Sequence, residues 1–228
     1  MPIHTNLKYL SLVIVFAIFT MITNGRAATI FWSVFGTVSS SDDVLNTGLL
    51  IQAEYAGGSG PLTINGITFQ SGFTSYVTAD GVSTREDVYN GDTGDAAYNI
   101  MLDHFAYDGT DPGVLILNSL SIGSHYQVEL WSLDDRGGID TRTENFDDGA
   151  GDFSATITTG NNTIIVGTFI ADGTQQIINV NGVGQTAHNL NAFELMAVPE
   201  PAPEPSAWML LAMGTIGLFA LRRSKTTV

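Results

Sequence analysis

Short apolar stretches separated by turn residues recur along most of this chain, and this spacing limits the folds open to it. Between residues 29 and 197, runs rich in Val, Ile, Phe and Thr return at intervals of roughly ten residues, which is typical of strands. Asn65-Gly66 separates two of these runs and is a strong signal for a hairpin turn. The pattern predicts an all-β body, either a β-sandwich or a jelly roll. The expected strands cover residues 29–38, 49–55, 62–64, 67–69, 114–120, 126–133, 153–158, 163–169, 175–180 and 192–197.

One segment departs from the strand pattern. Residues 96–105 place Ala97, Ile100 and Met101 at a spacing that suits a helix, and the preceding Asp95 is a favourable residue for a helix start. We therefore expect one short helix there. The Gly-, Asp- and Ser-rich segment 72–95 is expected to form long loops.

Charge and cysteine content exclude several classes of function. Residues 29–197 hold 21 acidic residues, three arginines and no lysine, a net charge of −18. Nucleic acid is therefore not an expected partner, because its phosphates require cationic contacts. The chain has no cysteine, which excludes disulfides and cysteine–zinc sites. A body of about 170 residues fits a single domain, which we place at residues 29–197.

The N-terminus has the features of a secretory signal peptide, assigned to residues 1–28. Lys8 precedes an apolar run over residues 9–22, and a small polar segment follows. The small residues Gly25 and Ala27 suit cleavage after Ala27. The body is therefore expected to be exported.

A membrane anchor is expected at the other end of the chain. Residues 207–221 are uncharged and apolar, and as a helix they would rise about 22 Å against a hydrocarbon core of about 30 Å. Trp208 at one interface and a snorkelling Arg222 and Arg223 at the other would accommodate this short transmembrane helix. The basic tail, residues 222–228, is expected to face the cytoplasm.

The tail as a whole resembles a known sorting signal. Within the spacer 198–206, Pro199-Glu200-Pro201 and a second Pro-Glu-Pro copy at 203–205 precede the apolar span and the basic cluster. This order resembles the PEP-CTERM tail of exported bacterial proteins. The resemblance implies an exosortase-type processing enzyme as partner, with Pro199, Glu200, Pro201, Arg222 and Arg223 as the sorting signal. It also implies anchoring in the inner membrane of a Gram-negative bacterium until processing, then release to the cell surface or extracellular matrix. Which Pro-Glu-Pro copy is read stays open.

The body carries a second resemblance. Residues 126–137, 167–172 and 191–195 are similar to the bodies of other exported proteins with this tail, which resemble galactose-binding-like β-sandwich domains. The resemblance implies the same fold. It says little about function, because such sandwiches host many functions.

The acidic segment after Trp131 is the first candidate site. Asp134, Asp135, Asp147 and Asp148 are the expected ligands of a structural calcium ion, since calcium takes six to eight oxygen ligands. The sequence contains no EF-hand loop and no calcium-binding nonapeptide repeat. The alternative is a solvated loop whose carboxylates pair with its arginines. No other cofactor is expected.

The same segment is a candidate carbohydrate site. Trp131 could stack on a sugar ring while Asp134, Asp135 and Arg136 bind its hydroxyls. However, side chains alternate along a strand, so Trp131 falls on the face opposite its apolar neighbours in segment 126–130. Filling of a core is the alternative role for Trp131.

Catalytic patterns are weak. His104, His125 and His188 are scattered, with no metal-binding histidine motif, and there is no Gly-x-Ser-x-Gly nucleophile motif.

Three hypotheses about function follow from the sequence. The leading one is an exported, non-catalytic β-sandwich protein of the cell surface or extracellular matrix. The second is a carbohydrate-binding module for extracellular polysaccharide, with or without calcium. The third is a polysaccharide hydrolase or lyase that uses a carboxylate pair.

Overall fold

The structure is a computed structural model of the 228-residue chain and describes residues 27–109, 112–137 and 142–200. The described residues up to Val198 belong to one compact unit, and Pro199 and Glu200, which are exposed, belong to a second. Most of the expected signal peptide, the apolar span 207–221 and the sorting residues Pro201, Arg222 and Arg223 lie outside the described residues. Among the described residues, no helix is long and apolar enough to cross a membrane.

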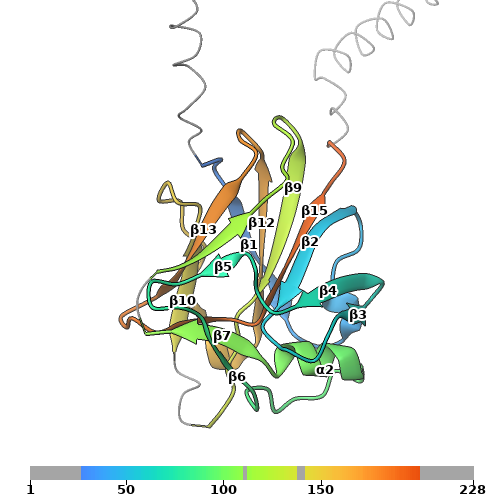
Figure 1. Cartoon of the computed structure of the whole chain (residues 1–228), viewed down its shortest axis with the longest axis vertical. Coiled ribbons are helices and arrows are strands. Elements are labelled where there is room, and N and C mark those ends of the chain that lie inside the picture. The colour runs from blue at the N-terminus through green and yellow to red at the C-terminus, as the bar shows by residue number, and fades with distance from the viewer. Residues whose placement is uncertain (1–26, 110–111, 138–141, 201–228) are drawn as a thin grey trace, which may run out of the picture. The chain divides into compact units, whose positions relative to one another are not determined.

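The described chain is built mostly of strands, which confirms the expected all-β sandwich body (Figure 1). Its elements are β1 (Phe31–Thr37), η1 (Ser41–Asp43), β2 (Leu49–Tyr55), β3 (Leu62–Ile64), β4 (Ile67–Ser71), β5 (Tyr76–Val77), β6 (Ser83–Arg85), α2 (Ala96–Leu102), β7 (Phe105–Asp108), β8 (Gly113–Leu117), β9 (His125–Trp131), β10 (Thr143–Asp147), β11 (Ile157–Thr158), η2 (Thr159–Asn161), β12 (Thr163–Ile170), β13 (Gln176–Gly182), β14 (His188–Leu190) and β15 (Ala192–Ala197).

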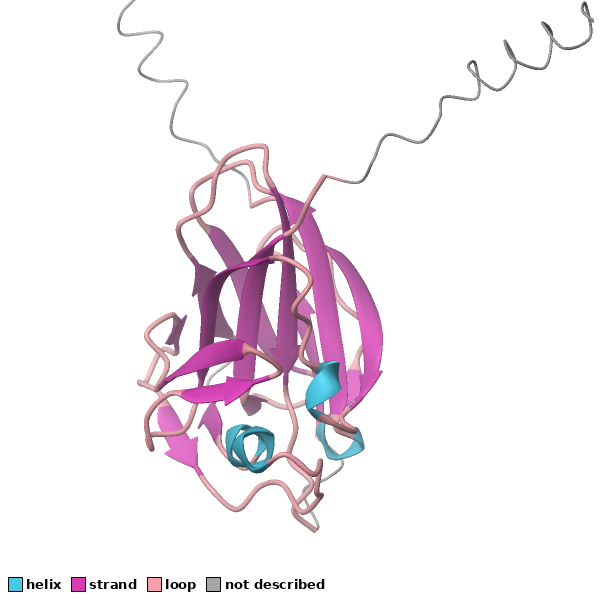
Figure 2. Cartoon of the chain, turned by 90° about the vertical axis from the view of Figure 1, so that its right-hand side faces the viewer, coloured by secondary structure: helices cyan, strands magenta, loops and turns pink. Residues whose placement is uncertain are grey.

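These strands form three sheets. The seven-stranded sheet has the order β1-β12-β9-β15-β2-β4-β3, and the five-stranded sheet has the order β11-β10-β13-β8-β5. A small sheet, β14-β7-β6, completes the body. Paired strands are antiparallel except β2 and β4, which run parallel. Figures 1 and 2 show α2 at one end of the body.

One hydrophobic core lies between the two larger sheets. The seven-stranded sheet contributes Val128 and Leu130 from β9 and Phe193 and Leu195 from β15. The five-stranded sheet contributes residues of β8, β10 and β13, such as Leu115, Leu117, Phe146, Ile178 and Val180. All are buried, and this burial is the main favourable contribution to folding.

A second core covers the other face of the seven-stranded sheet. Trp131 lies in it, together with Tyr55 and Met196 from neighbouring strands. Helix α2 covers this face with Tyr98, Met101 and Leu102, and β3 and β4 add Ile64 and Phe69. The two cores confirm the expected alternation along β9, which sends Leu130 to one face and Trp131 to the other.

Two local predictions are confirmed by backbone geometry. Asn65 and Gly66 have φ of 46° and 83° and connect β3 to β4, as a tight hairpin turn requires. The Asp95 carboxylate accepts hydrogen bonds from the amides of Ala97 and Tyr98 at 2.9 and 3.0 Å and caps α2. The helix ends at Leu102, and the last expected helical residue, Phe105, instead begins β7.

Other local predictions were wrong. The segment 72–95, expected to be loops, contains the short strands β5 and β6. Strands β7, β10 and β14 were not expected, and of the expected strand 153–158 only Ile157–Thr158 (β11) forms a strand. β10 was missed because it is rich in acids, which normally indicate loops. In β10, Phe146 and the buried Glu144 alternate with more exposed residues, so tertiary packing overrides composition here.

Candidate functional site

Asp134 and Arg136, both expected ligand-binding residues, form a closed ion pair just after β9. Arg136 donates from Nε to Asp134 Oδ1 at 2.7 Å and from Nη2 to Oδ2 at 2.6 Å, which is a bidentate geometry. Asp134 is fully buried, and the Arg136 guanidinium also lies 5.3 Å from the centre of the Phe105 ring. The hydrogen bonds to Asp134 raise the pKa of Arg136. The two side chains therefore bind each other, and their polar atoms are not directed at an external ligand.

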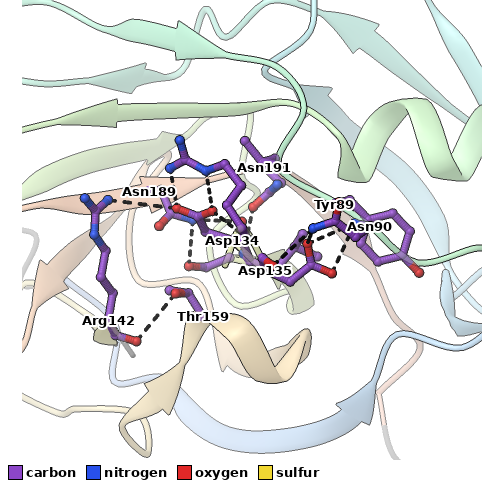
Figure 3. Close-up of polar contacts among 12 residues, drawn as sticks. Tyr89, Asn90, Asp134, Asp135, Arg142, Thr159, Asn189 and Asn191 are labelled. Atoms are coloured by element: carbon purple, nitrogen blue, oxygen red, sulfur yellow. Dashed lines mark hydrogen bonds and ion pairs between the residues drawn. The ribbon is translucent and has the colours of Figure 1, made fainter. Parts of the chain in front are cut away.

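Arg142 and Thr159 support this pair from a second side. Arg142 Nη1 lies 4.0 Å from Asp134 Oδ2, and the Thr159 amide donates to the Arg142 carbonyl at 2.9 Å. Figure 3 shows the Arg142 side chain directed at Asp134. The expected pairing of these carboxylates with arginines is confirmed for Asp134.

Asp135 binds a different partner, Asn90. Its Oδ1 and Oδ2 accept the Asn90 amide at 2.9 and 3.1 Å, and the Asn90 side-chain nitrogen donates to Oδ1 at 2.7 Å and to the Asp135 carbonyl at 3.1 Å (Figure 3). The Asp135 amide in turn donates to the Val88 carbonyl at 3.1 Å. Asp135 therefore fixes the loop that precedes α2.

Asp147 and Asp148 also satisfy protein groups. The side-chain amides of Asn179 and Asn181 donate to Asp147, each at 2.9 Å. Asp148 is fully buried and accepts main-chain amides of its own turn and, at 3.3 Å, that of Ile30. The part of the chain that the structure describes contains no group of three or more His, Asp or Glu side chains suited to a metal ion. Asp134, Asp135, Asp147 and Asp148 are therefore not brought together as one calcium site.

Trp131, the expected sugar platform, is a core residue. Its side chain is fully buried, Nε1 donates to the Tyr98 hydroxyl at 2.9 Å, and the Phe69 ring lies edge-on at 5.8 Å. Because its ring is fully buried and its polar atom is bonded to Tyr98, Trp131 cannot stack on a ligand in this conformation.

Sequence reasoning missed a buried polar group behind the ion pair. Glu144 accepts from Ser132 Oγ at 2.5 Å and from the Asn189 amide at 2.9 Å, and all three residues are buried. Burial raises the pKa of Glu144 to about 8. The acid-rich composition of β10 hid this role, and the signal in the sequence was the position of Glu144 two residues before Phe146, which puts both on the same face of the strand.

It also missed an open cavity of about 320 Å³ beside Asp135, between the loop 87–91 and α2. The cavity has one aromatic residue and several polar ones. Besides Gly91, it is lined by Asp87, Tyr89, Asn90, Asn99, Ile100 and Asp103. The isolated aromatic Tyr89 within an Asp- and Gly-rich segment was the signal in the sequence that could have indicated it.

Comparisons with known proteins identify a related fold but do not assign the chain to a family. No model of a known protein family matches the chain, and no curated protein matches it. The sorting-tail resemblance therefore remains a prediction. Among solved structures, the chain is similar to the plant receptor-like kinase ANX2, with TM-score 0.51 and 9% identity over 65% of this chain and 42% of that chain. It is also similar to the ANX1 ectodomain from Arabidopsis thaliana, with TM-score 0.50 and 12% identity over 77% of this chain and 58% of that chain.

A xylan-binding domain, CBM22-1 of Paenibacillus barcinonensis Xyn10C, matches with TM-score 0.40 and 12% identity over 69% of this chain and 100% of that domain. That TM-score is too low to carry an argument. The chain spans less than two thirds of both receptor structures. At these identities, the likeness to the receptors shows a shared β-sandwich fold alone.

Proposed function

We propose that this chain is an exported, non-catalytic β-sandwich protein that is sorted by its C-terminal tail to the cell surface or extracellular matrix. The observation that carries the proposal is the use of the acidic side chains. Asp134, Asp135, Asp147 and Asp148 all bind arginine, asparagine or main-chain amides of the protein itself. They act as braces for loops of a cysteine-free body, and the sequence predicts a signal peptide before that body and a sorting tail after it.

The sorting step would use residues beyond the folded body. The spacer begins at Val198, whose amide donates to the His125 carbonyl at 3.0 Å, and the exposed Pro199 and Glu200 follow directly. A processing enzyme that reads Pro199-Glu200-Pro201 would thus meet its signal immediately after the last strand. The apolar span and Arg222 and Arg223 would hold the chain in the inner membrane until cleavage.

Fractionation of a host that carries an exosortase tests this proposal. The wild-type chain should leave the inner membrane, and a variant with Pro199, Glu200 and Pro201 all changed to Ala should stay there with its tail intact. Alanine at all three residues of the second copy, 203–205, is the matched control, and its behaviour identifies the copy that is read. Recovery of the wild-type chain uncleaved in the cytoplasm would contradict the proposal.

Carbohydrate binding is the second candidate function, and the cavity beside Asp135 favours it. Tyr89 supplies an aromatic ring there, and Asp87 and Asp103 supply hydrogen-bond acceptors. Polysaccharides of a matrix are the ligands that such a displayed domain would meet. A glycan array probed with the purified chain tests this function, and a blank array would remove it while leaving the sorting proposal in place.

A further inference from the structure

The cavity beside Asp135 is held in shape from two directions. Asp103 Oδ1 accepts the amides of Val88 and Tyr89 at 2.9 and 3.2 Å, which fastens the loop 87–91 to the end of α2. The four hydrogen bonds between Asn90 and Asp135 fasten the same loop to the chain after β9. A preformed cavity of this kind loses little conformational entropy when a ligand binds.

Gly91 leaves room for the aromatic ring of Tyr89. A Cβ atom at Gly91 would lie within 2.4 Å of the Tyr89 hydroxyl oxygen, so only glycine lets this ring rest against the loop backbone. Tyr89 itself is half-buried and packs partly against the second core. Ile100, whose side chain is 39% exposed, adds apolar surface from α2. The cavity therefore has an apolar part, which Tyr89 and Ile100 form.

The carboxylates that line the cavity can accept further hydrogen bonds. In the described part of the chain, the exposed Asp87 carboxylate has no hydrogen-bond partner, and Asp103 uses only Oδ1. The lining contains no cationic side chain. Burial raises the pKa of Tyr89, and the nearby carboxylates of Asp135 and Asp92 raise it further. A negative potential of this kind disfavours an anionic ligand.

We propose that this cavity binds one residue of a neutral saccharide, with the sugar ring against Tyr89 and its hydroxyls donating to Asp87 and Asp103. The inference rests on the second candidate function and names its site and its ligand class. Sugar hydroxyls that donate to carboxylates form charge-assisted hydrogen bonds, which are stronger than neutral ones. The cavity volume of about 320 Å³ lies at the lower end of small-ligand pockets, about 300–1,000 Å³. Uronic-acid saccharides are excluded, because their carboxylates would face Asp87 and Asp103.

Isothermal titration calorimetry on the full chain, kept in a detergent without a sugar head group, tests the inference. The probes are oligosaccharides of xylose, glucose, mannose and galactose, with oligogalacturonate as the matched anion and calcium chloride as a separate arm. At least one neutral oligosaccharide should bind, and oligogalacturonate should not. Tyr89→Ala should weaken binding about tenfold, the loss expected for one aromatic contact.

Asp87→Asn provides a variant that keeps the fold. Asp87 is exposed with φ of 59°, a conformation that asparagine also adopts readily. It should weaken binding about fivefold, as a charge-assisted hydrogen bond becomes a neutral one. Asp172→Asn, which changes an exposed acid between β12 and β13, is the control and should bind as wild type.

Three results would overturn the inference. If a saccharide binds all variants equally, the site is wrong although the chain binds carbohydrate. If no saccharide binds here and the glycan array is also blank, both carbohydrate proposals fall and the sorting proposal stands. If calcium binds and Asp87→Asn abolishes that binding without any saccharide effect, the cavity is a cation site.

Discussion

Glu129 on β9 lies directly opposite Glu194 on β15, and both side chains are buried. They share the face of the seven-stranded sheet that also carries Trp131 and Met196. Glu129 Oε2 accepts the Leu45 amide at 3.1 Å, whereas Glu129 Oε1 and Glu194 Oε2 have no hydrogen-bond partner in the described part of the chain. Burial, with smaller contributions from Glu194 and Asp43, raises the pKa of Glu129 to about 9, and burial raises that of Glu194 to about 8.

This pair makes the stability of the fold depend on pH. In the unfolded chain both carboxyls ionise near their ordinary pKa of 4.5, whereas the folded chain keeps them protonated to about pH 8 to 9. Between these values the folded state binds more protons, so the free energy of unfolding falls as pH rises. Their favourable contribution is complete below pH 4.5 and is lost as pH passes through 8 to 9. Urea unfolding measured from pH 5 to pH 9 should therefore show a steady decrease in the free energy of unfolding.

Glu194→Gln removes one of these titrations. At pH 8 the melting temperature should rise by at least about 2–4 °C, which corresponds to about 1 kcal/mol for a chain of this size, and the decrease with pH should become shallower. The exposed Glu86→Gln is the control and should leave the slope unchanged. Because burial also raises the pKa of Glu144 to about 8, some pH dependence of stability should remain in every variant. An unchanged slope in Glu194→Gln would show that the pair is ionised in the folded chain.

Removal of one partner of the buried ion pair should be costly. Arg136→Ala leaves the Asp134 carboxylate buried without its bidentate partner, and we expect a loss of about 3–5 kcal/mol in the free energy of unfolding. Arg142, at 4.0 Å, can offset part of this loss. Urea unfolding measures it.

The double variant Asp134→Leu/Arg136→Met separates the charge from the packing. Because it removes both charges, it should recover most of the stability lost in Arg136→Ala. Arg85→Ala, at an exposed position in β6, should have an effect within about 0.5 kcal/mol. Equal losses for Arg136→Ala and Arg85→Ala would mean that the pair is solvated.

Trp131 should matter for stability and not for ligand binding. Trp131→Phe keeps most of the apolar volume but leaves the buried Tyr98 hydroxyl without its donor, which should cost about 1–3 kcal/mol. Thermal unfolding measures the cost. Affinity for any bound saccharide should stay unchanged, and a selective loss of binding with normal stability would restore the sugar-platform hypothesis.

Calcium should have little effect on the fold. A ligand that binds only the folded state raises the melting temperature, and the candidate carboxylates already bind protein groups. Melting curves in millimolar calcium and in chelator should coincide. A melting temperature several degrees higher in calcium would contradict this prediction and indicate an ion bound to the candidate carboxylates. Loss of that rise in Asp147→Asn would then locate the ion.

The sequence predicted those parts of the fold that depend on local pattern. The bounds of β2 and β3, the turn at Asn65-Gly66 and the cap at Asp95 all follow from strand alternation and the conformations of single residues. Acid-rich β10 was missed because its burial depends on partners distant in the chain, such as the Val180 that pairs with Phe146.

The candidate site was less predictable, because its geometry depends on which residues meet in space. The sequence placed Asp134 and Asp135 in one acidic group, but Asp134 pairs with Arg136 and Asp135 binds Asn90, 45 positions away. Side-chain alternation correctly indicated that Trp131 leaves the face of Leu130. Nothing local indicates that Tyr98 would cover it.

Mass spectrometry of the mature chain tests the sorting proposal most directly. Ala28 is buried and its amide donates to Gln176 Oε1 at 2.8 Å, so the folded body includes the residue that follows the expected signal-peptide cleavage site. From a host with an exosortase, the account predicts a product that begins at Ala28 and ends within residues 198–206. From the same host without the enzyme, the tail through Val228 should be retained in the membrane fraction. A product with the same C-terminus in both hosts would contradict the account.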